Sequence, residues 1–98
     1  MAKPEFHALE APPDALEKGG HEVLRASVVD GAVSVALRRS FDDPHVWGLL
    51  LADLAHQAAR LYAIETGLSG DEALEQIYAG IETGMTRPTN FGDTKPAH

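Results

Sequence analysis

The stretch Val23-Leu-Arg-Ala-Ser-Val-Val-Asp-Gly-Ala-Val-Ser-Val-Ala-Leu-Arg38 decides the fold of this chain, because it predicts a β-hairpin. Asp30-Gly31 is typical of a two-residue turn in which both residues take positive φ angles. A turn of this length fixes the register, with Val28 opposite Val33. The six side chains of the resulting apolar face are Leu24, Ala26, Val28, Val33, Val35 and Leu37. We therefore expect strands at about residues 22–29 and 32–39, with one face covered.

Two helices are predicted after the hairpin. Asp43 followed by Pro44 is typical of a helix start, and Gly67 is typical of the residue just past a helix end, so the first helix covers about residues 44–66. Ser69 and Glu72 match a capping box, which predicts a second helix over about residues 70–85.

The order of these elements predicts an α+β fold in which both helices pack on one face of the sheet. We expect an irregular arm over residues 1–20, a single domain over residues 21–87 and a flexible tail over residues 88–98. A two-stranded sheet is marginal on its own. The sheet is therefore expected to be extended by dimerisation or by an N-terminal strand at residues 5–9.

The long helix carries more apolar surface than one hairpin face and one short helix can cover. Its apolar stripe consists of Trp47, Leu50, Leu51, Leu54, Ala55, Ala58, Leu61 and Tyr62. A second copy of the chain would cover the remainder, either through a shared sheet or through packing of the long helices across a two-fold axis. These features favour a homodimer over a chain completed by its own arm.

Composition excludes several classes of function. The 98 residues contain no cysteine, which excludes disulfides and thiolate chemistry, and no apolar run approaches the length of a membrane span. The net charge of −7 disfavours nucleic acid, although Arg25, Arg38 and Arg39 form a local basic strip on the hairpin. The first residues contain no signal-peptide core, so we expect a cytoplasmic protein. No sequence motif indicates a cofactor.

One polar patch on the long helix is a candidate binding site. Asp53, His56 and Arg60 are spaced by three and four residues and therefore share a helix face, where a carboxylate could orient an imidazole beside a guanidinium. The competing interpretation is the solvated strip of an otherwise apolar helix. No metal site is predicted, because His45 lies roughly 16 Å along the helix from His56.

The run Trp47-Gly-Leu-Leu-Leu-Ala-Asp53, the Val23-Leu-Arg25 strand and the Pro12-Pro13 arm together resemble a small proteobacterial family known only as a domain of unknown function. The resemblance extends from about Pro12 to Thr89. It implies a bacterial cytoplasmic protein without an assigned activity, so it transfers no functional residues.

Two functional hypotheses follow from the sequence. The favoured one is a small homodimeric, non-catalytic interaction or accessory protein, because excess apolar helix surface coincides with the absence of catalytic signatures. The alternative is a domain that binds a small molecule or an anion through Asp53, His56 and Arg60, with or without catalysis. Nucleic-acid binding through the three arginines is the third hypothesis.

Overall fold

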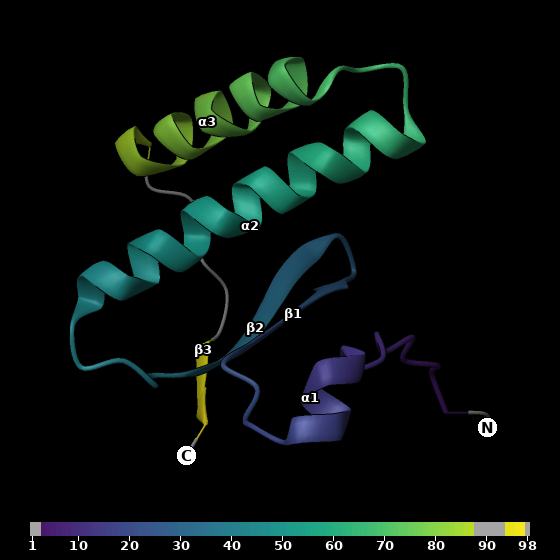
Figure 1. Cartoon of the computed structure of the whole chain (residues 1–98), viewed down its shortest axis with the longest axis vertical. Helices are drawn as coiled ribbons and strands as arrows, with labels where there is room; N and C mark the ends of the chain where they lie inside the picture. Colours follow the sequence, from purple (N-terminus) through teal and green to yellow (C-terminus); the bar gives the residue numbers. More distant parts are fainter. Residues whose placement is uncertain (1–2, 88–93, 98) are drawn as a thin grey trace.

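The computed structural model describes residues 3–87 and 94–97 and confirms an α+β fold, with a hairpin followed by two helices (Figure 1). The elements in chain order are α1 (Pro13–Lys18), β1 (Leu24–Val29), β2 (Ala32–Arg38), α2 (Pro44–Glu65), α3 (Gly70–Thr86) and β3 (Thr94–Ala97). The sheet has the order β1-β2-β3, so β2 is its central strand.

The hairpin forms with the predicted register. Val28 pairs with Val33 and Leu24 pairs with Leu37 in an antiparallel ladder. The turn residues Asp30 and Gly31 have φ angles of 51° and 78°, as the two-residue turn requires. The hairpin therefore follows from its local sequence alone.

The third strand comes from the C-terminal part of the chain, which corrects two predictions. We expected a flexible tail over residues 88–98, but Thr94–Ala97 pair in parallel with β2, whose second edge offers unpaired backbone groups. Residues 88–93 and 98 lie outside the described residues. Within the chain, the sheet is thus extended by C-terminal residues and not by the expected N-terminal strand at residues 5–9.

The N-terminal arm does not join the sheet. Residues 5–9 have no regular structure, and every described residue from 3 to 22 is exposed, Phe6 and Leu9 included. The arm contains only the six-residue helix α1, which begins after Pro12. The apolar surface of the domain is therefore not covered by this arm.

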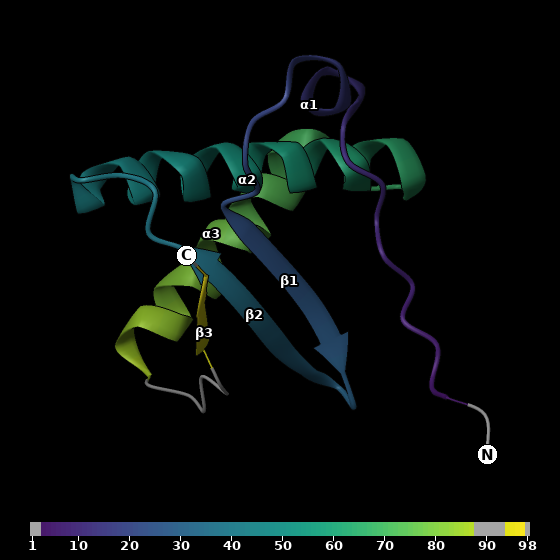
Figure 2. The same cartoon turned by 90° about the horizontal axis from the view of Figure 1, so that it is seen from below.

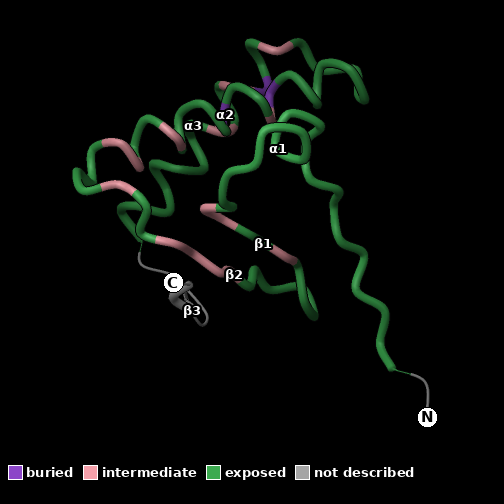
Figure 3. The backbone as a smooth tube through the Cα atoms, turned by 60° about the horizontal axis from the view of Figure 1, so that its bottom comes forward, coloured by how far each residue is buried: buried purple, intermediate pink, exposed green. Residues whose placement is uncertain are grey.

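The helices begin at the predicted caps and pack closely on each other. The Asp43 side chain accepts a hydrogen bond from the His45 N–H, and the complete Ser69–Glu72 capping box is present. At the end of α2, Gly67 does not take the left-handed conformation; extended Thr66 ends the helix instead, bonding back to Tyr62. Three alanines fill the contact between α2 and α3. They are Ala55, Ala59 and Ala73, and they form the buried core of the described residues (Figure 3).

The sheet and the helix pair are joined mainly at one corner. Within the described ranges, no strand residue has its Cα within 8 Å of a Cα in α2 or α3. At the corner after β2, the Arg39 carbonyl accepts hydrogen bonds from the Phe41 N–H at 2.6 Å and from the Trp47 indole N–H at 2.9 Å. Figure 2 shows the hairpin running away from this corner, so that its tip lies clear of both helices. The expected close cover of the sheet by the helices is therefore incomplete within one chain.

Candidate functional site

The three side chains predicted as a binding face lie on the exposed surface of α2. Asp53, His56 and Arg60 are all exposed. The hydrogen bonds and ion pairs found among the described residues join none of these three side chains to another. They therefore share one side of a helix without forming a bonded cluster.

His56 instead meets Tyr78 of α3. The Tyr78 hydroxyl lies 3.5 Å from His56 Nε2, and the two rings meet edge to face with their centroids 6.4 Å apart. A separation of 3.5 Å is at the long end for a hydrogen bond, and both side chains are exposed. Tyr78 was not among the predicted site residues, because it recurs at helical spacing with the apolar residues Leu74, Ile77 and Ile81 of the same helix. The pair adds a polar contact between the helices beside the alanine core.

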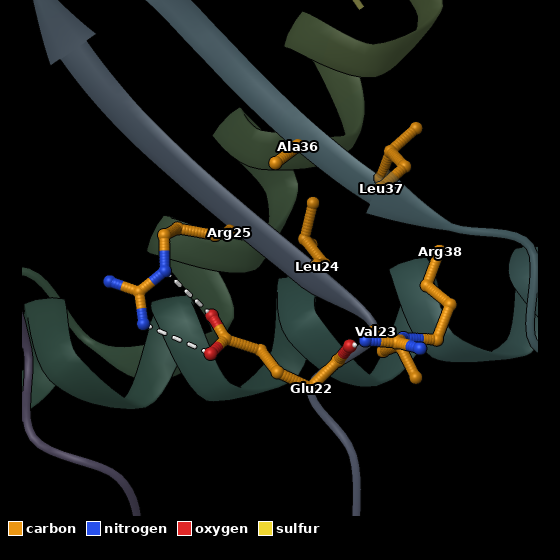
Figure 4. Close-up of a pocket in the computed structure, with 7 residues that line it drawn as sticks. All are labelled: Glu22, Val23, Leu24, Arg25, Ala36, Leu37 and Arg38. Carbon is orange, nitrogen blue, oxygen red and sulfur yellow. Dashed lines mark hydrogen bonds and ion pairs between the residues drawn. The ribbon is translucent and has the colours of Figure 1, made fainter. Parts of the chain in front are cut away.

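A second polar site lies at the base of the hairpin, where β1 begins and β2 ends. Two guanidinium nitrogens of Arg25 each lie 2.9 Å from a carboxylate oxygen of Glu22 (Figure 4). Arg38 Nε donates a hydrogen bond to the backbone carbonyl of Glu22 at 3.1 Å. The hollow between them has a volume of about 190 Å³, below the roughly 300–1,000 Å³ of typical ligand pockets. Its lining consists of Glu22, Val23, Leu24, Arg25, Ala36, Leu37 and Arg38.

The basic strip predicted on the hairpin is largely neutralised by nearby groups. Glu22 compensates the charge of Arg25, and Asp42 lies 3.8 Å from Arg39. Of the three arginines, Arg38 alone has a backbone carbonyl rather than a carboxylate as its partner among the described residues, so its charge is not neutralised by a partner. Because phosphate binding depends on uncompensated positive charge, this pattern gives little support to nucleic-acid binding.

The described residues provide neither a metal cluster nor a membrane helix. Among residues 3–87 and 94–97, no group of three or more histidine, aspartate or glutamate side chains is arranged to hold an ion. None of the helices in the described part of the chain has the length and apolar character that a membrane crossing requires.

The described surface also exposes many large apolar side chains. Val28 and Val33 at the hairpin tip are 77% and 58% exposed, although they belong to the predicted inner face of the sheet. Along α2, Leu54, Leu61 and Ile64 are exposed as well. By contrast, Leu24 and Leu37 at the hairpin base are half-buried. Apolar exposure therefore increases along the hairpin away from the corner with the helices.

Comparison with known proteins places this architecture in a family. Among solved structures, a protein described as the "structure of a putative pyruvate dehydrogenase from the photosynthetic bacterium Rhodopseudomonas palustrus CGA009" is 44% identical to this chain. The match covers 100% of both chains with a TM-score of 0.71. No curated protein matches the chain. A family model described as "Domain of unknown function (DUF5076)" matches residues 8–89, and the chain therefore belongs to this family.

Proposed function

We propose that this chain acts as a homodimeric, non-catalytic interaction protein. The observation that carries the proposal is the amount of surface that one copy leaves open. The chain exposes 8775 Å². A compact monomer of its 10.5 kDa mass would expose about 5,400 Å². The radius of gyration is 15.7 Å, where about 13 Å is expected for a compact chain of this length.

The surplus of roughly 3,400 Å² is large enough to form an interface. A standard interface removes about 800 Å² from each partner, and obligate homodimers bury more. Part of the surplus belongs to the extended N-terminal arm, but the valines at the hairpin tip and the leucines of α2 contribute to it directly. A second copy is the simplest partner, because one apolar patch then covers the same patch on the other chain.

The test is the solution mass of the full chain, measured by light scattering over a dilution series into the low micromolar range. A mass near twice 10.5 kDa is expected at every concentration. A monomer throughout the series would overturn the homodimer and leave the apolar surface to a different protein. We also place the protein in the bacterial cytoplasm, which cell fractionation would test.

The alternative proposal is that the polar face of α2 binds a small anion. The contact between His56 and Tyr78 supports this alternative, because the tyrosine ring and hydroxyl hold the His56 imidazole in one orientation on the surface of α2. The name of the structural relative suggests pyruvate as the probe, with binding measured by calorimetry. His56→Ala should then abolish pyruvate binding at near-native stability, while Gln57→Ala, also exposed on α2, should leave it unchanged. Equal binding by the two variants would eliminate this site.

A further inference from the structure

The two outer edges of the sheet differ in chemistry. β3 forms one edge and carries Lys95 and Pro96, two residue types that block further strand pairing. β1 forms the other edge with the sequence LRASVV, which contains neither lysine nor proline. The N-terminal arm does not cover β1, because every described arm residue from 3 to 22 is exposed. One edge is thus protected by its sequence and the other is open.

The open edge has a defined set of unpaired backbone groups. The Arg38 N–H donates to the Val23 carbonyl at 2.9 Å, so Val23 bonds toward β2. Residues of an antiparallel strand alternate between the two sides, which leaves the N–H and C=O groups of Leu24, Ala26 and Val28 pointing outward. The side chains of the same three residues lie on the apolar face.

We propose that β1 pairs antiparallel with β1 of a second copy, with Ala26 opposite itself on the two-fold axis. The inference rests on the homodimer proposed above and specifies its geometry. A two-fold axis perpendicular to the sheet keeps both apolar faces on the same side, and residues directly opposite each other must share a face. Centring on Ala26 meets this condition and places Leu24 opposite Val28 of the second copy. All three outward residues then form hydrogen-bonded pairs, giving about six bonds between the chains.

This pairing also places the exposed hairpin tip beside the second copy. Antiparallel alignment brings each tip beside the base of the other hairpin, the end of the hairpin from which the chain leads into α2. Val28 would then lie opposite Leu24 of the second copy, a residue that is half-buried at the base of the hairpin. The combined sheet has six strands and ends on both sides in β3. The sequence of β3 contains a lysine and a proline, two residue types that disfavour further strand pairing, so we expect the assembly to stop at two copies.

Cross-linking of single-cysteine variants of the full chain tests this geometry, since the chain has no native cysteine. Opposed Cα atoms in a hydrogen-bonded pair lie about 5.5 Å apart, within reach of a disulfide. Ala26→Cys should therefore form a covalent dimer on mild oxidation. Ser34→Cys, exposed on β2, is the matched control, because two copies of Ser34 would lie more than about 14 Å apart. We expect at least roughly tenfold more covalent dimer from Ala26→Cys.

The solution mass, measured in parallel, separates the two proposals. A dimer by mass in which Ala26→Cys cross-links no better than Ser34→Cys would overturn the β1 pairing and leave the homodimer intact. A monomer by mass would overturn both proposals.

If the cysteine itself perturbs the strand, Ala26→Pro provides a second test. Proline removes the outward N–H of residue 26, and it leaves every hydrogen bond between β1 and β2 in place. Circular dichroism should remain native, while the dimer Kd should rise about 10- to 100-fold; an unchanged Kd would contradict the pairing.

Discussion

The helix pair and the hairpin differ in how far one chain completes them. α2 and α3 begin at capped residues and bury alanines against each other. The hairpin is equally well specified in register, but one edge and the tip of one face remain open. Accurate local structure and tertiary cover are thus separate properties of a sequence. Where the first is present without the second, as in β1, the open strand edge is where we propose that a second copy binds.

The largest expected effect tests whether the helix pair is as closely packed as its alanines indicate. Ala59→Leu adds volume at a buried contact, so it should lower the free energy of unfolding by about 1–3 kcal/mol. Ala63→Leu, exposed on the same helix, is the control and should change it by less than about 0.5 kcal/mol. Urea denaturation at fixed protein concentration measures both. Equal losses of unfolding free energy in the two variants would mean that the contact between α2 and α3 is not closely packed.

The next effect tests the hairpin turn. Gly31 has a φ angle of 78°, so Gly31→Ala should lower the free energy of unfolding by about 1–2 kcal/mol. Gly80→Ala is the contrast in α3, where an added Cβ meets no atom within 4 Å, and it should stabilise the protein by about 0.5–1 kcal/mol. Thermal unfolding compares the two. A neutral Gly31→Ala would show that the turn does not hold the register.

The smallest effect tests the corner between the two regions. Trp47→Phe keeps an aromatic ring beside Phe41 but removes the hydrogen bond to the Arg39 carbonyl, which should cost about 0.5–1.5 kcal/mol of unfolding free energy. Tyr62→Phe, an exposed site on the same helix, should cost less than about 0.5 kcal/mol. If the two variants lose the same amount, the indole contact is not what joins the sheet to the helices.

Sequence reasoning predicted the parts of the fold that neighbouring residues determine. Asp30-Gly31 determines the hairpin register, and Ser69 with Glu72 determines the start of α3, because each signal acts within a few residues. It missed β3, since Thr94–Ala97 is short, contains a proline and pairs with a strand far away in the sequence. Periodicity also identified apolar residues on α2 without identifying what covers them.

For the candidate site, too, local features were predicted from the sequence and contacts between distant segments were not. Helical spacing correctly placed Asp53, His56 and Arg60 along α2, because that spacing is a property of a single helix. The contact between His56 and Tyr78 depends on how α3 crosses α2, and a 22-residue separation carries no local signal for it. The outward groups of β1 could have been derived from the predicted register, since only the position of β2 is needed.

The parallel pairing of β2 with β3 has a consequence for the order of folding. It joins Val35 to Thr94, whereas the hairpin joins neighbours across a two-residue turn and each helix bonds within itself. Closing a long loop costs more entropy than closing a short one, by about 0.6 kcal/mol for each doubling of length. Loop-closure entropy therefore predicts that the hairpin and the helices form first and that β3 docks on β2 afterwards. With this order, β2 would be an edge strand until β3 docks, and both edges of the hairpin would be open to other strands during folding.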